Sequence, residues 1–249
     1  MDIYNEFTEF YAKGIYPKFS EYMLQLMPKI LNRYNKNPKK ILDVACGIGT
    51  FAIGMAKQGY QVTGIDLSEN MLEIAKQNMV LQNTSVNFIK MDMRELNFNS
   101  EFDLVTCFYD SLNYILKIHD LKKVFNGMYN ALRDNGLLIF DMNTVYGLAV
   151  NWQSSNCVIQ KDNEYYFELH TTDFDFEKNI AILKIIGFKK MNNHWEKFEE
   201  IHKEKAYTQK VIENCLIEAG FKKPKLLGSI KNFTEPTPKS GRVWFVAEK

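Results

Sequence analysis

The sequence predicts an α/β protein with a doubly wound, mainly parallel seven-stranded sheet and an antiparallel β cap inserted after the fifth strand. Two observations carry this prediction. Five short apolar runs alternate with helical segments between residues 41 and 142. After Tyr146 the pattern changes to β-branched and aromatic residues with short polar breaks, which is typical of antiparallel strands.

The N-terminal 36 residues are expected to form a helical cap. Between Phe19 and Tyr34 the apolar residues recur at the spacing of one helix face, and Pro28 is expected to kink or divide this helix. An aromatic segment from Tyr4 to Tyr16 precedes it. We expect this segment to form a short helix that covers a sheet edge or a ligand.

The parallel sheet is expected to consist of residues 37–144 and 207–249. Its first five strands are predicted at residues 41–45, 61–65, 86–89, 102–108 and 137–142. Ser68 and Asp120 are expected to cap two of the intervening helices, and Asn135-Gly136 is expected to end the second of them. A last helix at 208–219 and two strands at 225–229 and 243–247 complete this unit.

Residues 145–206 are expected to form the antiparallel cap. Its predicted turns are Asp162-Asn163, Lys178-Asn179 and Asn192-Asn193, where polar pairs interrupt the β-rich pattern. Because this insertion is not needed to close the parallel sheet, it is available to form a lid over a second pocket.

Composition favours a small-molecule partner. The chain has 31 Lys and Arg against 30 Asp and Glu, so no net field attracts it to nucleic acid or to an anionic membrane. It shows no long apolar run and no signal-peptide pattern at the N-terminus, so we expect a cytoplasmic protein, either monomer or homodimer. The cysteines are scattered, and no metal site is expected. They are Cys46, Cys107, Cys157 and Cys215.

The strongest motif spans residues 41–50, where an apolar strand runs into a turn that contains Gly47 and Gly49. Glycines at such a turn allow a ligand to approach the backbone. The pattern Gly47-x-Gly49-x-x-Ala52 also fits the loose dinucleotide fingerprint. A tight turn without a ligand is a further alternative.

Three aspartates, Asp43, Asp66 and Asp92, stand at the ends of successive predicted strands. A carboxylate at the position of Asp66 can accept hydrogen bonds from both hydroxyls of a ribose. Asp92 is placed to accept from an adenine amino group, although a helix cap is the alternative for any such aspartate. The residues expected to contact the adenine ring are Leu67, Met71 and Met93.

These segments resemble the class I S-adenosylmethionine-dependent methyltransferases. The matching stretches are Leu42-Asp43-Val44-Ala45-Cys46-Gly47-Ile48-Gly49-Thr50, Gly64-Ile65-Asp66-Leu67-Ser68 with Met71-Leu72, and Asp92-Met93. The chain is also similar to the family's fourth strand at 102–107 and to its fifth strand, with the preceding turn, at 132–141. The resemblance implies a Rossmann-like fold, a methyltransferase activity and S-adenosyl-L-methionine as the cofactor.

The resemblance places Asp43, Ala45 and Gly47 near the amino acid end of the cofactor. Ala45 is a departure, because family members usually have glycine there. Tyr11 is implied to lie over the cofactor carboxylate, with a plain core aromatic as the alternative. The residues implied to line the sulfonium pocket are Cys107 and Phe108.

The cap resembles that of small-molecule methyltransferases such as the glycine and aminosugar N-methyltransferases, most clearly at residues 200–208. This implies a small acceptor, with N- and O-methylation both open. Tyr114 is expected to contact the nucleophile, and His202 is a candidate proton acceptor. A histidine that only makes hydrogen bonds within the cap is the alternative for His202.

Two other functions use the same features. A nicotinamide-dependent oxidoreductase would share the glycine turn and Asp66, but it normally needs a second nucleotide-binding half, which the β-rich insertion does not supply. An RNA methyltransferase would share the cofactor, but the near-neutral charge opposes RNA binding.

Overall fold

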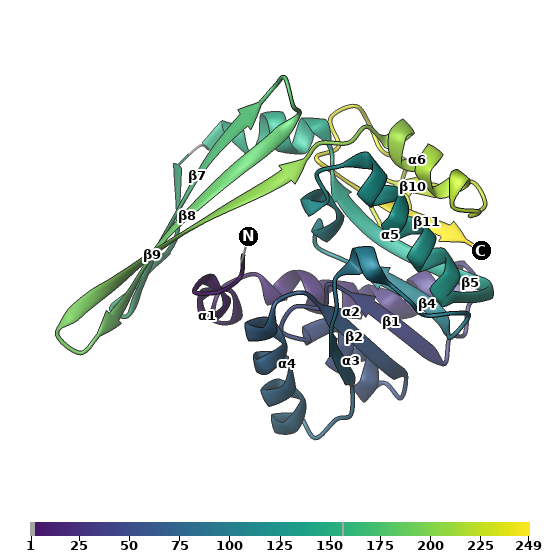
Figure 1. Ribbon diagram of the computed structural model, residues 1–249, viewed down its shortest axis with the longest axis horizontal. Coiled ribbons are helices and arrows are strands. Elements are labelled where there is room, and N and C mark those ends of the chain that lie inside the picture. The colour runs from purple at the N-terminus through teal and green to yellow at the C-terminus, as the bar shows by residue number, and fades with distance from the viewer. Residues whose placement is uncertain (1–2, 156) are drawn as a thin grey trace.

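The computed structural model describes residues 3–155 and 157–249 and contains the predicted seven-stranded sheet (Figure 1). The strand order is β10-β11-β5-β4-β1-β2-β3. Strands β1 to β5 pair in parallel, whereas β11 is antiparallel to both β5 and β10. The strands are β1 (Lys40–Val44), β2 (Gln61–Asp66), β3 (Asn87–Lys90), β4 (Phe102–Cys107), β5 (Leu132–Asn143), β10 (Lys225–Leu227) and β11 (Arg242–Glu248).

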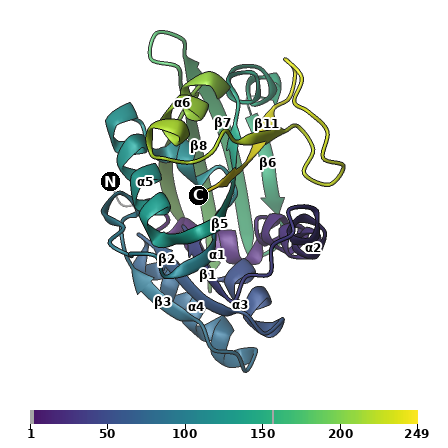
Figure 2. The same ribbon diagram turned by 90° about the vertical axis from the view of Figure 1, so that its right-hand side faces the viewer.

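Helices cover both faces of this sheet, as the alternation of strands and helices predicts (Figure 2). Helices α5 (Ile118–Ala131) and α6 (Gln209–Glu218) pack on the face to which Leu42 and Val44 contribute. Helices α2 (Pro17–Arg33) and α3 (Thr50–Lys57) pack on the other face, together with Ile41. Successive residues of β1 therefore serve two separate apolar cores, which explains why its apolar residues Ile41, Leu42 and Val44 occupy both faces.

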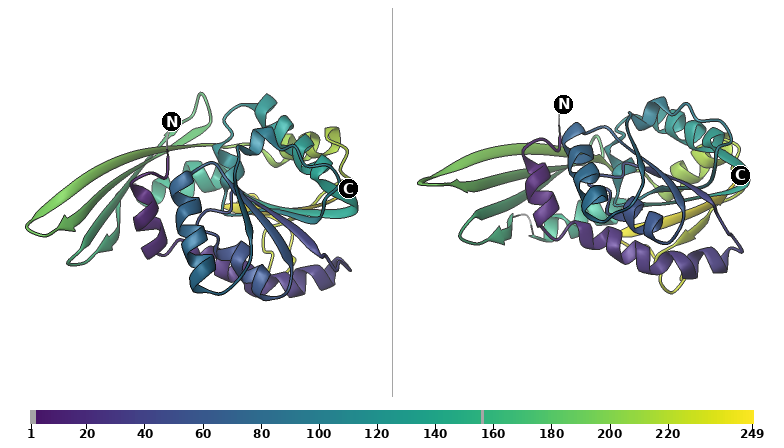
Figure 3. Two further views of the ribbon diagram at one scale, coloured as in Figure 1. Left: turned by 60° about the horizontal axis from the view of Figure 1, so that its bottom comes forward. Right: turned by 90° about the horizontal axis from the view of Figure 1, so that it is seen from below.

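The predicted antiparallel cap is a four-stranded sheet that extends away from the parallel sheet (Figures 1 and 3). Its strands are β6 (Cys157–Asp162), β7 (Tyr166–Asp175), β8 (Ile180–Met191) and β9 (His194–Lys205). All three predicted turns connect neighbouring strands. Helix α1 (Phe7–Lys13) lies between this lid and helix α4 (Glu69–Leu81), as both views of Figure 3 show.

Three local predictions are wrong. Asp120 lies in the first turn of α5 and does not cap it, because the helix begins one turn earlier, after Lys117. Asn135-Gly136 does not end this helix; β5 already begins at Leu132, which pairs with Phe102 across a β-bulge. Helix α2 continues through Pro28.

The helix tolerates Pro28 because this residue is on the exposed face, between buried turns that hold α2 to the sheet. No helix in the described part of the chain is long and apolar enough to cross a bilayer.

Replacing Pro28 by alanine is expected to stabilise the protein. Alanine restores the amide that a proline lacks and removes the ring's contact with the carbonyl of Leu24, a gain of about 1–3 kcal/mol. Thermal unfolding followed by circular dichroism should show a midpoint raised by about 2–4 °C for each kcal/mol. Gln25→Ala, at another exposed position of α2, should leave the midpoint nearly unchanged. A lower midpoint for Pro28→Ala would contradict this explanation.

Candidate functional site

The carboxyl ends of β4, β1, β2 and β3 lie side by side and bring the predicted aspartates to one edge of the sheet. Asp43 pairs in register with Gly64 of β2 and with Thr106 of β4. Asp66 ends β2, and Asp92 follows β3. In an open parallel sheet this edge, where the strand order reverses, is the usual place for a ligand.

The glycine turn leaves open space beside its backbone. Gly47 has a φ of +55°, and a Cβ built there would meet no atom within 4 Å. Gly49 has a φ of +78°, and its Cβ would lie 2.7 Å from the ring of Phe88. Gly49 is therefore required by packing and backbone conformation, whereas Gly47 forms a cradle that a ligand can approach.

Ala45 also has a left-handed backbone, with a φ of 57°. This conformation costs a residue with a side chain roughly 1–2 kcal/mol, which explains why glycine is the usual residue here. Such strain is typically stored at a functional site.

The Asp66 carboxylate joins the glycine turn to the segment after β2. It accepts hydrogen bonds from the Gly47 amide at 2.8 Å and from the Ser68 amide at 2.9 Å. Burial raises the pKa of Asp66, although these amides and that of Leu67 oppose the shift. An ionised carboxylate has about four acceptor positions, so it can accept from a hydroxyl of a ligand in addition to the backbone amides.

Tyr114 and His202, the two predicted acceptor-side residues, are in contact. Tyr114 belongs to the 3₁₀ turn η2 (Ser111–Tyr114) just after β4, and His202 lies on β9 of the lid. The Tyr114 hydroxyl is 3.0 Å from Nδ1 of His202, and Nε2 of His202 is 3.2 Å from the Glu200 carboxylate. The hydroxyl of Tyr4 lies 3.0 Å from that of Tyr114. The site is thus closed by a chain of polar groups that spans from the sheet edge to the lid.

Comparison with known proteins identifies the family. A model described as a methyltransferase domain matches residues 41–136. The chain is 32% identical over 249 residues to a protein of Geobacillus sp. (strain WCH70) that is named as a putative methyltransferase, and the match covers 99% of each chain. The chain belongs to the class I S-adenosylmethionine-dependent methyltransferases.

Solved structures agree with this assignment. A crystal structure of an S-adenosylmethionine-dependent methyltransferase from Clostridium acetobutylicum ATCC 824 matches with a TM-score of 0.83 and 27% identity, covering 99% of both chains. The sugar N-methyltransferase KedS8 from Streptoalloteichus sp ATCC 53650 matches with a TM-score of 0.76 and 18% identity, covering all of this chain and 93% of that chain. At this identity KedS8 is evidence for the shared fold alone.

The residues at the sheet edge of this methyltransferase fit its cofactor, S-adenosylmethionine. The open space at Gly47 suits the amino acid end, and the remaining acceptor capacity of Asp66 suits the ribose. Asp43 is 3% exposed and accepts a hydrogen bond from the Thr106 hydroxyl at 2.9 Å. Burial raises the pKa of Asp43 to about 7, against the effect of Thr106. Asp43 therefore supports the floor of the site from beneath the glycine turn.

The predicted adenine side is more exposed. Arg94 donates to Asp92 through its backbone amide at 2.9 Å and through its guanidinium, and this lowers the pKa of Asp92 despite partial burial. Asp92 thereby caps the 3₁₀ turn η1 (Met93–Glu95), which is the alternative expected for this aspartate, and its contact with an adenine amino group stays a prediction. Met71 is buried, whereas Leu67 is 56% exposed. Met93 is half-buried and packs against the core cluster that contains the buried face of α5.

The remaining predicted cofactor residues are Tyr11, Cys107 and Phe108, and they pack in three different apolar clusters. Tyr11 stacks on Tyr16 at 5.0 Å between ring centroids, and burial raises its pKa well above the usual range. Cys107 is fully buried, and Phe108 packs edge-on against Phe51. The rings in contact with Tyr11 are Tyr4, Phe7 and Tyr16 of the N-terminal part of the chain, and its contact with the cofactor stays a prediction.

A buried charge cluster beside the site was missed by sequence reasoning. Asp141 accepts hydrogen bonds from the amides of Tyr109 and Asp110 at 2.7 and 3.0 Å, and it pairs with Arg242. Tyr109 and Asp110 both have left-handed backbones, with φ of 61° and 54°. The signal in the sequence is an aspartate inside the otherwise apolar run at residues 137–142. Glu204 of the lid joins this cluster through a hydrogen bond of 3.1 Å from Asn143.

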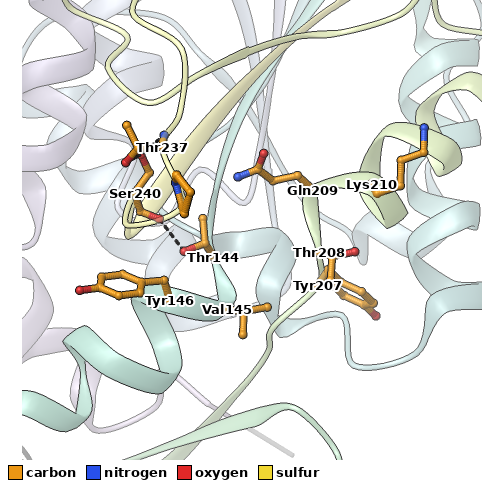
Figure 4. Close-up of a pocket in the computed structure, with 10 residues that line it drawn as sticks. Thr144, Val145, Tyr146, Tyr207, Thr208, Gln209, Lys210, Thr237 and Ser240 are labelled. Carbon is orange, nitrogen blue, oxygen red and sulfur yellow. Dashed lines mark hydrogen bonds between the residues drawn. The ribbon is translucent and has the colours of Figure 1, made fainter.

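A separate cavity of about 350 Å³ lies at the root of the lid (Figure 4). Thr144, at the end of β5, donates a hydrogen bond of 2.7 Å to the carbonyl of Ser240 there. Tyr146, Gln209 and Lys210 also line this cavity. None of the predicted cofactor residues does, so this cavity is not the cofactor site.

Asp66→Ala is expected to weaken S-adenosylmethionine binding by about 1.5–3 kcal/mol, because hydrogen bonds to a charged acceptor are lost. Isothermal titration calorimetry measures this directly. Asp103→Ala is a matched control, since Asp103 also accepts two backbone amides but lies at the opposite end of β4. Unchanged affinity in Asp66→Ala, or an equal loss in Asp103→Ala, would contradict the assignment.

Proposed function

We propose that this methyltransferase acts on a small-molecule acceptor and methylates a nitrogen or oxygen whose proton is taken by Tyr114 and His202. The hydrogen bond of 3.0 Å between these two side chains carries the proposal. It joins the end of β4, beside the cofactor edge, to the lid. A nucleophile bound between lid and sheet would be adjacent to both.

Three observations support a small acceptor. The lid extends from the sheet edge that holds the cofactor residues, so an acceptor has to fit between them (Figure 1). The formal net charge is only +1, which gives no general attraction for RNA. KedS8, whose fold covers this whole chain including the lid, is a sugar N-methyltransferase.

S-adenosylmethionine supplies an activated methyl group on a sulfonium. The residues of the chain orient the acceptor, exclude water and remove one proton. As the acceptor's proton moves to the Tyr114 oxygen, the Tyr114 hydroxyl proton moves to Nδ1 of His202. Burial raises the pKa of Tyr114 well above its usual range, so Tyr114 is a protonated relay at neutral pH. The Glu200 carboxylate, 3.2 Å from Nε2, stabilises the resulting imidazolium.

A transfer assay with methyl-labelled S-adenosylmethionine tests the proposed function. The acceptors are a panel of small amines, aminosugars and hydroxyl compounds, with bulk RNA in a parallel reaction. Label is expected in one or more small molecules. Label in RNA alone would overturn the proposal. A titration with NADH, in which no binding is expected, addresses the oxidoreductase alternative.

His202→Gln is expected to lower turnover and to change its pH dependence. A neutral imidazole is needed to accept the proton, so kcat/KM of the native enzyme is expected to fall at acidic pH. The variant should not show this fall of kcat/KM at acidic pH, and its kcat should be lower by about 10²–10⁴-fold. His194→Gln, at an exposed position on the same strand, is the matched control and should keep the native pH dependence and the native kcat. An unaltered profile in His202→Gln would reduce His202 to a structural residue.

A further inference from the structure

One carboxylate in the lid binds two different parts of the molecule. Glu200 is 9% exposed and accepts backbone hydrogen bonds from Tyr4 at 2.8 Å, Asn5 at 3.1 Å and Phe7 at 3.0 Å. It also lies 3.2 Å from Nε2 of His202. The N-terminal segment, residues 4–7, and the imidazole therefore share a single acceptor group.

A single oxygen atom of Glu200 contacts both the N-terminal segment and the imidazole. Oε2 of Glu200 faces both the Tyr4 amide and Nε2 of His202, whereas Oε1 faces Asn5 and Phe7. A carboxylate only accepts, so Nε2 of His202 carries the hydrogen, and Nδ1 of the neutral ring is left as an acceptor. The Tyr114 hydroxyl then donates to Nδ1, the orientation that proton removal requires.

The N-terminal segment also contacts Tyr114, which lies on the opposite side of His202 from Glu200. The Tyr4 hydroxyl is 3.0 Å from that of Tyr114. Tyr4 has a left-handed backbone with a φ of 60°, a conformation that needs support from its surroundings. The Ser68 hydroxyl supplies some of it by donating to the Tyr4 carbonyl at 3.0 Å, and Asn70 donates to the Asn5 side chain at 3.1 Å. The segment thus bridges the lid and the start of α4.

We infer that Glu200 is a positioning residue that couples docking of the N-terminal segment to the proton-accepting form of His202. The inference rests on the proposed function, in which His202 takes the acceptor's proton. It adds that the relay is complete only while the segment covers the site. The segment contributes Tyr4 to the relay and, through Glu200, holds the imidazole in the required tautomer.

Loss of the segment would leave a buried carboxylate without three of its donors. The pKa of Glu200 is lowered in this structure because bonds from His202, Phe7 and Tyr4 outweigh the opposing effect of burial. Without the bonds from Phe7 and Tyr4, the carboxylate loses two of the donors that keep its pKa low and that fix its position against Nε2 of His202. The titratable groups in contact with His202 are Tyr4, Tyr114 and Glu200, and the charges of Glu204 and Asp110 act on Tyr114.

Glu200→Gln in the full chain tests the coupling. The amide nitrogen would replace one carboxylate oxygen. Its N–H groups would then face the backbone amides of residues 4–7 or Nε2 of His202, which are donors themselves. Two measurements need no acceptor: the His202 tautomer from imidazole ¹⁵N shifts, and hydrogen exchange of the amides in residues 4–7. The expected result is a change to the Nδ1-protonated tautomer together with amide exchange about tenfold faster or more. Glu199→Gln, the adjacent outward-facing residue, should alter neither.

Asn70→Ala is a second variant that loosens the segment from α4 without touching Glu200 or His202. Faster amide exchange should again be accompanied by a mixed His202 tautomer. If amide exchange becomes faster in both variants while the His202 tautomer does not change, Glu200 only anchors the segment and the inference is wrong. A change of tautomer with a fully protected segment would also overturn it.

Turnover then separates this inference from the proposed function. With an active acceptor, Glu200→Gln should lower kcat about tenfold or more and shift the acidic limb of kcat/KM, with little effect on cofactor affinity. If methyl transfer works but neither tautomer nor exchange changes in Glu200→Gln, the coupling is wrong and the proposed function stands. If the tautomer responds but no small acceptor is methylated, the proposed function is wrong.

Discussion

The buried carboxylate of Asp141 supports the turn after β4, on which the acceptor side of the site depends. The amides of Tyr109 and Asp110 donate to it, and Arg242 balances its charge. Two consecutive left-handed residues are costly, roughly 1–2 kcal/mol each, and these bonds offset that cost. Because the turn leads directly into η2, Asp141 also determines where Tyr114 stands.

The parallel part of the fold and the cofactor edge could be predicted from the sequence because both depend on local patterns. The apolar residues of β1 and β2 lie on both faces of each strand, since apolar cores cover both faces of the sheet. The aspartates at their ends meet because parallel strands place their carboxyl ends at one edge. Ala45 was identified as unusual from the family pattern, and its φ of 57° supplies the physical reason.

The acceptor side was harder to predict because its contacts join residues far apart in the chain. Glu200 and Tyr4 are 196 positions apart, and no local pattern links them. The chemistry of Tyr114 and His202 makes them candidates from the sequence alone. The distance between their side chains depends on how the lid lies over the sheet, which the sequence does not show. Asp120 shows the same limitation at a helix end: an aspartate near the start of α5 is favourable in the first turn as well as at the cap.

The lid carries two Glu-x-His pairs, and their surroundings explain why only one is placed for the proposed proton transfer. In β7, Oε1 of Glu168 lies 2.7 Å from Nε2 of His170, and both side chains contact the hydroxyl of Tyr16 at the junction of α1 and α2. Glu200 and His202 of β9 contact Tyr114, which belongs to the sheet edge. The ring of Phe7 lies between the two histidines, with centroids 6.3 and 5.8 Å away. The N-terminal segment is therefore held by both pairs, so the lid and the segment cover the site as one unit.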